Sequence, residues 1–321
     1  MFKIKYITVV FFLFLTKSVL AQYTDQINSN RPGESQGAFS VGKSIFQIEG
    51  GLTALKEKHD LLYTQTRGFN GNVNFRWGLF FEQLEINLEA TYQKDQFTTI
   101  LGSEGRNGVK KTIIGAKYLF FDPFKNKDNK PNLYSWKANH SFKWKQFIPA
   151  LSLYAGANLN FNNPYTFKGD PIASPKIVLI AQNQFDGGYV LVTNIIADKF
   201  TSAFPSYGYI LTLTKGFSEK WSGFIENQSF KSNYYADSIL RGGAAFLLKK
   251  NIQLDGSVST NFKNTPSILY GGIGLSWRFE KNYKPIRIKD KNNGGKSSKK
   301  DKTDDAKKRN DQVPTTPDLK K

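Results

Sequence analysis

The segment Q-L-E-I-N-L-E-A-T-Y-Q-K, which begins at Gln83, alternates between apolar and polar side chains. Leu84 and Ile86 fall on one face of a strand and Glu85 and Asn87 on the other, because successive side chains of a strand point to opposite faces. A soluble strand can show this pattern, but about twelve such segments recur with no helix-period stretch between them. A barrel that is apolar outside and polar inside has this signature. The sequence therefore predicts an all-β fold, a transmembrane antiparallel up-and-down β-barrel of about 12 strands.

Most of the candidate strands are long enough for the ~9–11 residues that a tilted membrane-spanning strand needs. If the N-terminus is periplasmic, residues 56–67, 95–107 and 161–173 form the longer outer loops, and residues 186–188 and 250–251 form short inner turns. This asymmetry is typical of bacterial barrels. Residues 122–147 break it, and are either a periplasmic excursion, which we favour, or a further strand. The candidate strands lie at 42–55, 68–77, 82–94, 108–121, 148–160, 174–185, 189–200, 206–217, 220–231, 239–249, 252–262 and 267–279.

The two ends of the chain differ from the barrel region. Residues 1–21 have a basic start, a short apolar centre and a small-residue cleavage site, which together indicate a secretory signal peptide. A single N-terminal anchor helix is the alternative. Residues 22–41 are a polar lead-in that we expect on the periplasmic side, and residues 42–279 form the outer-membrane barrel. Residues 280–321 are almost free of apolar side chains and predict a basic, disordered periplasmic tail.

Composition restricts the partners. The formal net charge is +19, but secretion argues against nucleic acid, and anionic lipid headgroups are the expected counter-charge. The tail is either a solvated spacer or a contact with the cell wall. Outer-membrane lipid and a small-molecule solute are the main expected partners. The chain contains no cysteine, which excludes a lipidated Cys, disulfides and thiol chemistry.

Strand parity predicts which side chains face the lumen. A midplane Arg or Lys on the lipid face costs ~2–4 kcal/mol, so charged residues in strands should point inward. Both signs of charge occur there, and they either create a transverse field that orients solutes or form ion pairs that brace a closed barrel. The predicted lumen-lining residues are Asn72, Asn74, Arg76, Glu85, Asn87, Glu89, Lys117, Glu226, Arg241, Asp255 and Arg278.

Catalysis has little support in the sequence. The two histidines, His59 and His140, have no partner at metal-ligand spacing, and no cofactor motif is present, so neither a metal site nor a cofactor is expected. Outer-membrane hydrolases use a Ser activated by a His, which draws attention to His140 and Ser141. Adjacent strand residues face opposite ways, however, and this pair lies in the irregular 122–147 segment. The sequence predicts a protein that is not an enzyme.

Several motifs resemble one family of outer-membrane barrels. The run N-S-N-R-P-G-E-S from Asn28, followed by G-K-S-I-F-Q-I-E-G-G from Gly42, resembles the start of the transporter group named for the meta-pathway of phenol degradation. The stretches from Gly115, from Ile148 and from Gly272 are also similar to that group. The resemblance covers about residues 25–280, with Asn30 at a position where the group commonly has Asp.

The resemblance implies an outer-membrane protein that passes small, aromatic or hydrophobic compounds. It places Asn30, Arg31, Pro32 and Glu34 in a motif at the periplasmic mouth, where Arg31 and Glu34 could pair as a plug or latch; a local turn held by Pro32 is the alternative. The cleavage site and the composition resemble those of a Gram-negative, Bacteroidetes-like source.

Three functions remain, in this order of preference. The first is a channel or uptake barrel for small molecules. The second is a closed structural barrel whose loops or tail bind partners or cell wall. The third is a membrane lipid hydrolase that uses His140.

Overall fold

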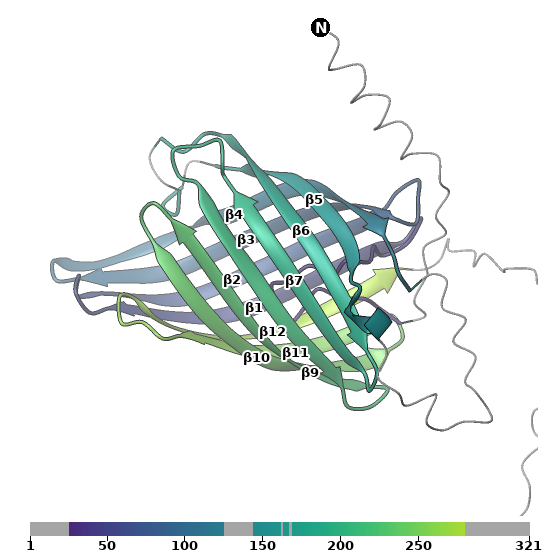
Figure 1. The fold of residues 1–321 in the computed structure, drawn as a ribbon. Helices are drawn as coiled ribbons and strands as arrows, with labels where there is room; N and C mark the ends of the chain where they lie inside the picture. The colour runs from purple at the N-terminus through teal and green to yellow at the C-terminus, as the bar shows by residue number, and fades with distance from the viewer. Residues whose placement is uncertain (1–25, 125–143, 162, 167–168, 280–321) are drawn as a thin grey trace, which may run out of the picture. The chain divides into compact units, whose positions relative to one another are not determined.

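A computed structural model describes residues 26–124, 144–161, 163–166 and 169–279. The predicted signal peptide, the basic tail and His140 lie outside these residues. The described chain forms one closed barrel in which each strand pairs antiparallel with the next and β12 pairs with β1 (Figure 1). This confirms the predicted 12-stranded up-and-down barrel. The strands are β1 (Phe46–His59), β2 (Thr64–Gly78), β3 (Leu84–Thr99), β4 (Gly102–Phe121), β5 (Ala150–Leu159), β6 (Ala173–Phe185), β7 (Tyr189–Asp198), β8 (Ser206–Gly216), β9 (Trp221–Ser232), β10 (Ala236–Lys249), β11 (Ile252–Asn261) and β12 (Ser267–Phe279).

The barrel has two distinct ends. We name the end where β1 begins and β12 finishes the turn end, and the opposite end the loop end. A short 3-10 helix, η2 (Trp144–Phe147), precedes β5 at the turn end. The turn end also holds the connections 79–83, 186–188, 217–220 and 250–251. The loop end holds the connections 60–63, 100–101, 160–172, 199–205, 233–235 and 262–266.

The outward face of the barrel is apolar around its circumference. Leu52, Ile225 and Ile273, on β1, β9 and β12, are 65%, 63% and 69% exposed. Every one of the twelve strands carries at least one exposed large apolar side chain of this kind. An exposed apolar surface of this extent suits contact with hydrocarbon, as in a transmembrane barrel. Within the described part of the chain, no helix is both long enough and apolar enough to cross a membrane.

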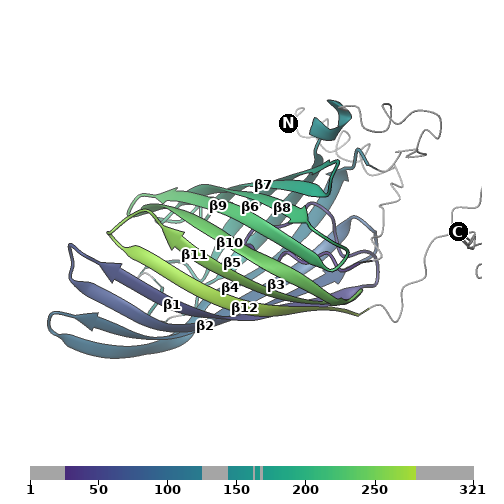
Figure 2. The same ribbon diagram turned by 90° about the horizontal axis from the view of Figure 1, so that it is seen from below.

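Two of the expected outer loops are strand instead. β1 and β2 remain paired from Lys56 with Arg67 to His59 with Thr64, and β3 and β4 remain paired to Thr99 with Gly102. The prediction of long loops at 56–67 and 95–107 was therefore wrong. Polar side chains continue along both faces there, so pairing persists beyond the apolar band. These hairpins extend farther than their neighbours at the loop end (Figure 2).

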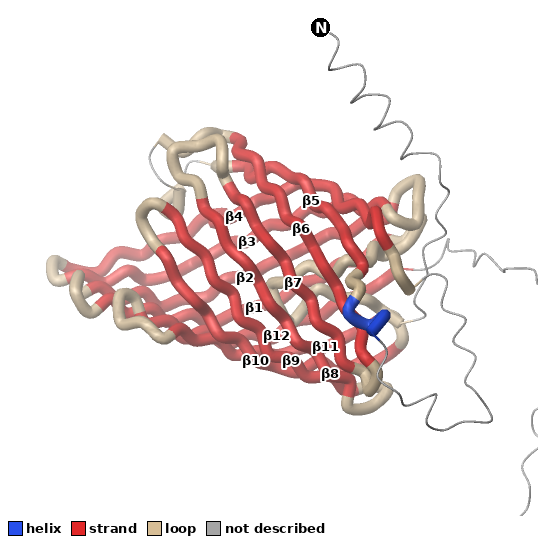
Figure 3. The backbone as a smooth tube through the Cα atoms, viewed as in Figure 1, coloured by secondary structure: helices blue, strands red, loops and turns tan. Residues whose placement is uncertain are grey.

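The first strand also begins later than expected, at Phe46. Gly42 and Ser44 have φ values of 97° and 61°, a left-handed conformation that cannot continue a strand. The preceding chain, residues 26–45, is irregular, and we name it the inner segment. The sequence predicts residues 22–41 as an irregular lead-in on the periplasmic side. The inner segment is irregular but lies inside the barrel, where Figure 3 shows it as a tan tube behind the strands.

The exposed outward face leads to a test of membrane contact. Replacing Ile273 with Arg should lower the free energy of unfolding by about 2–4 kcal/mol in a bilayer, because the guanidinium would enter hydrocarbon. Reversible denaturant unfolding in phospholipid vesicles measures this difference. The variant Ile273→Val is the control and should change the free energy by less than about 1.5 kcal/mol. Equal stability of the Arg and Val variants would contradict a lipid-facing β12.

Candidate functional site: the lumen and the inner segment

The backbone of the inner segment is bound by side chains of the barrel wall. The amide of Ala38 donates to Gln182 at 2.9 Å, and Gln36 exchanges two hydrogen bonds with the Asn194 side chain, at 2.6 and 2.9 Å. The Ser152 hydroxyl donates to the Ala38 carbonyl at 2.5 Å. Buried backbone groups need partners, and an irregular segment cannot supply them itself. The polar inward side chains of β5, β6 and β7 therefore serve as partners for the inner segment.

Arg31 joins the inner segment to two strands, β2 and β11. Its guanidinium donates to both Asp255 carboxylate oxygens, with a closest distance of 3.1 Å, and to Asn72 Oδ1 at 3.0 Å. A Cβ added at Gly51 or at Gly274 would lie 2.3 or 2.2 Å from this guanidinium. Glycine at both positions therefore makes room for Arg31 between β1 and β12.

Glu226 provides a second anchor. Its carboxylate accepts from the backbone amides of Glu34, at 3.1 Å, and Ser35, at 3.3 Å. It also pairs with Arg241 and accepts from the Thr212 hydroxyl at 2.8 Å. The proposed pairing of Arg31 with Glu34 was wrong, since Arg31 pairs with Asp255 and Glu34 contacts Glu226 through its main chain.

A third group of charges is buried at the turn end. Arg76 donates to Glu49 and to Glu85, both at 2.8 Å, and Lys117 lies 3.4 Å from Glu85. All four side chains are at most 1% exposed. The cluster also holds the inner segment: Glu85 accepts from the Val41 amide at 2.9 Å, and Lys117 donates to the Gly37 and Phe39 carbonyls.

Part of the lumen wall is apolar, which strand parity did not predict. Ile113, Val178, Ile180 and Val192 on β4, β6 and β7 are buried and point inward, where they form one apolar cluster that includes Ala38 of the inner segment. The sequence could have revealed this apolar wall, because these strands carry apolar residues at inward as well as outward positions. A barrel with a polar interior needs apolar residues only at the outward positions. An apolar inner face indicates that a segment of the protein covers it.

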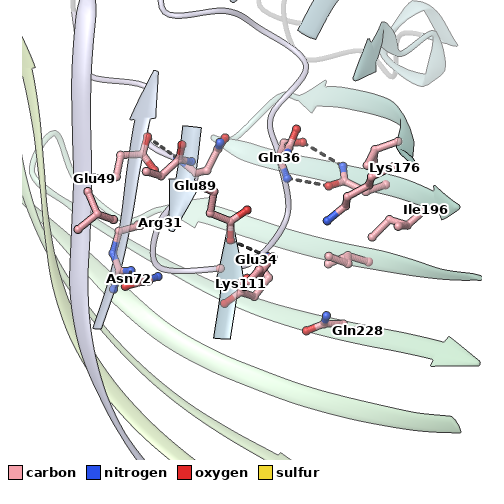
Figure 4. Close-up of a pocket in the computed structure, with 17 residues that line it drawn as sticks. Arg31, Glu34, Gln36, Glu49, Asn72, Glu89, Lys111, Lys176, Ile196 and Gln228 are labelled. Atoms are coloured by element: carbon pink, nitrogen blue, oxygen red, sulfur yellow. Dashed lines mark hydrogen bonds and ion pairs between the residues drawn. The ribbon is translucent and has the colours of Figure 1, made fainter. Parts of the chain in front are cut away.

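Three cavities follow the inner segment along the lumen, and Figure 4 shows the residues that line the middle one. The loop-end cavity has a volume of about 470 Å³ and is lined by Lys110, Asp198, Arg241 and Tyr270, among others. The middle cavity, of about 100 Å³, includes the ion pair of Lys111 with Glu89 at 2.6 Å. The turn-end cavity measures about 220 Å³ and includes Pro32. Arg31 lines all three cavities, so its side chain lies where they meet.

The other residues predicted from the sequence also lie inside the barrel, where some line a cavity and others only bind neighbouring groups. Asn30 binds the inner segment to itself by accepting from the Gly37 amide at 3.0 Å. Asn74 lines the middle cavity. Asn87 is buried on β3, and Arg278 donates to the Gln26 carbonyl at 2.7 Å. The predicted residues that line a cavity are Asn72, Asn74, Glu89 and Arg241, with Asn30, Arg31, Pro32 and Glu34 of the inner segment, whereas Arg76, Glu85, Asn87, Lys117, Glu226, Asp255 and Arg278 are outside the cavity linings.

Neither histidine marks a reactive site in the described structure. His59 lies near the tip of the β1–β2 hairpin, where its Nδ1 accepts from the Leu62 amide at 3.2 Å. Across residues 26–124, 144–161, 163–166 and 169–279, no group of three His, Asp or Glu side chains could hold a metal ion.

Comparison with protein families identifies the barrel. The family described as "Putative MetA-pathway of phenol degradation" matches residues 29–279, from the inner segment to the end of β12. The chain belongs to this family. The match confirms the resemblance drawn from the N-terminal motif. No curated protein matches the sequence significantly.

Solved structures share the barrel architecture at low sequence identity. An outer membrane channel from Pseudomonas putida F1 has 10% identity and a TM-score of 0.48, over 79% of this chain and 100% of that one. The NanC porin has 7% identity and a TM-score of 0.43, over 70% and 98%. The CymD monoaromatic hydrocarbon channel has 7% identity and a TM-score of 0.38, over 74% and 88%.

The buried charges lead to a stability prediction. Replacing Arg76 with Met should lower the free energy of unfolding by about 3–5 kcal/mol, because Glu49 and Glu85 would remain buried without their partner. Lys111→Met is the matched control, since the Lys111–Glu89 pair is 35% and 24% exposed, and its loss should cost at most about 1 kcal/mol. Denaturant unfolding in vesicles compares the two variants. An equal decrease in the free energy of unfolding for both variants would show that the buried Arg76 cluster stabilises the barrel no more than the partly exposed Lys111–Glu89 pair.

The position of Arg31 leads to a second prediction. Replacing Gly51 with Ala should displace Arg31 and loosen the inner segment, because the new Cβ would overlap the guanidinium. The chain lacks cysteine, so the buried Ser35 can be replaced by Cys as a single reporter. Its reaction with a water-soluble maleimide should be faster in the Gly51→Ala background.

Gly50→Ala is the control for this experiment, since a Cβ at Gly50 comes no closer than 3.5 Å to other atoms. The labelling rate in this background should equal that of the parent. The assignment of Gly51 would fail if both alanine variants reacted at the parent rate.

Proposed function

We propose that the protein is an outer-membrane channel for small organic solutes, in which the inner segment narrows the passage. The observation that carries this proposal is the series of three cavities along the lumen, with Arg31 where they meet. A barrel whose only purpose was structural would be more stable with that space filled. Water-filled spaces between polar walls suit solutes that leave and re-enter water.

Orientation follows from the two ends of the barrel. Bacterial barrels place short turns and both chain ends in the periplasm. The turn end, with the inner segment, then faces the periplasm, and the loop-end cavity receives solutes from outside. A basic tail at residues 280–321 would start on the periplasmic side, where cell-wall polymer is within its reach.

The lining of the loop-end cavity supports solutes that have both apolar and polar parts. Phe230, Ile239 and Tyr270 line it from β9, β10 and β12, while Lys110 and Lys111 line it from β4. In a closed ring of twelve strands, β4 lies opposite β10. An aromatic or hydrophobic compound that carries a polar or anionic group would find complementary walls, as in other mixed ligand sites.

A closed structural barrel is the second candidate. The attachments of the inner segment favour it, since Asp255 pairs with Arg31, and Glu226 and Glu85 accept hydrogen bonds from backbone amides of the segment. Whether ions pass the segment separates the two candidates.

Conductance in planar bilayers tests the channel. The full-length protein should give discrete single-channel currents, and Arg31→Ala should increase the conductance because it removes the side chain that lines all three cavities. Small aromatic acids added on the loop-end side should reduce the current. Arg67→Ala, which removes an exposed arginine from β2, is the matched control and should conduct like the parent. Correctly folded protein that leaves the bilayer sealed, with or without Arg31, would support the structural barrel instead.

A further inference from the structure

Three cations lie side by side on the outward face of the barrel near the loop end. Lys56 on β1 is the register partner of Arg67 on β2. Lys94 on β3 pairs with Phe69, two residues from Arg67 and on the same face. Directly opposite residues in a sheet have Cβ atoms about 5 Å apart, and diagonal residues about 7–8 Å apart. Three long cationic side chains can therefore reach one group.

These cations mark the edge of the apolar surface. Below them on the same face lie Leu52, Phe69 and Tyr92, which are 65%, 67% and 51% exposed. The outward positions of β1 are apolar from Phe46 to Ala54, which is roughly 26 Å along the strand and about 20 Å along the barrel axis once the tilt is included. This approaches the ~25 Å apolar band of outer-membrane barrels. Lys56, Arg67 and Lys94 thus lie at the level of lipid headgroups.

The described residues of the barrel provide no counter-charge for this group. Lys56, Arg67 and Lys94 are exposed, and none takes part in an ion pair with another described residue. The outward positions of β1, β2 and β3 contain no Asp or Glu, and Arg67 lies 2.9 Å from the Gln65 amide side chain. Lys58, one outward position farther along β1, by contrast pairs with Asp60 at 3.0 Å.

The arrangement is local to one side of the barrel. At the loop end of β9, Lys231 also lies on the outward face, but its register partners are Tyr207 and Ala236. These two register partners add no positive charge. Three adjacent strands that each change from apolar residues to a cation within two residues of one another in the register form a more specific surface than a scattered basic residue.

We propose that Lys56, Arg67 and Lys94 bind the phosphate of a lipid A-type glycolipid in the outer leaflet, with acyl chains along Leu52, Phe69 and Tyr92. The proposal rests on the orientation proposed above, in which the loop end faces outward. Arg binds phosphate oxygens through two parallel hydrogen bonds, and Lys adds point charges. The lipid supplies in one molecule the anionic group and the apolar chains that this surface complements.

Titration of the full-length protein with lipid A in neutral detergent micelles tests the site. The parent should bind phosphorylated lipid A at least about tenfold more tightly than the same lipid after enzymatic removal of its phosphate, since a cation at a lipid surface contributes about fivefold. Each of Lys56→Gln, Arg67→Gln and Lys94→Gln should weaken binding by about fivefold, and the triple variant should lose the preference for phosphate. Equal binding of the two lipids by the parent would overturn the proposal, whatever the variants do.

Lys231→Gln is the matched control, because it removes one exposed outward cation at the same end of the barrel. It should keep the parent affinity, and an equal loss in this variant would overturn the assignment to one site. Displacement of lipid A by a similar concentration of inorganic phosphate would also overturn it, since the apolar face would then contribute nothing. The triple variant should conduct like the parent in planar bilayers, so failure of the lipid site and failure of the channel are separate results.

Discussion

An irregular chain can lie inside a barrel only if its backbone polar groups find partners there, and this requirement organises the lumen. The inner segment has no sheet or helix of its own over residues 26–45. Wall side chains take the place of secondary structure, with Gln182 and Asn194 bound to the main chain of Gln36 and Ala38. The inward polar side chains, which in other barrels contact water, here bind the main chain of the inner segment.

The buried charges serve both the wall and the inner segment. Glu85 accepts from Arg76 on the neighbouring strand and from the Val41 amide, and Glu226 likewise accepts from Arg241 and from the main chain at Glu34. An isolated carboxylate inside a protein would be costly, so each needs several donors. Because some of those donors belong to the inner segment, its position and the stability of the wall depend on each other.

This dependence connects structure with passage. Arg31 is held by Asp255 and Asn72 and lies where the three cavities meet, so the same contacts that hold the inner segment also set how narrow the lumen is. The outward face has a separate chemistry, in which Lys56, Arg67 and Lys94 form a cationic group without protein partners. The interior charges described above pair with other residues of the chain, whereas the proposed partner of this outward group is an anionic lipid.

The sequence by itself determined the barrel, because period-two alternation decides which side chains can meet lipid; the inward positions of Arg76, Glu85 and Arg278 follow directly from that parity. It also indicated the N-terminal motif around Arg31 as a functional segment. It placed Arg31 and Glu34 at the periplasmic mouth as a plug or latch, but it did not predict that residues 26–45 lie inside the lumen, that Arg31 pairs with Asp255, or that Ile113 and Val178 join Ala38 in one apolar cluster. Those contacts join residues far apart in the chain, and local alternation carries no information about which strand faces which across a closed ring. Only the tertiary structure, by closing β12 onto β1, brings Gly51 and Gly274 to the two sides of one guanidinium.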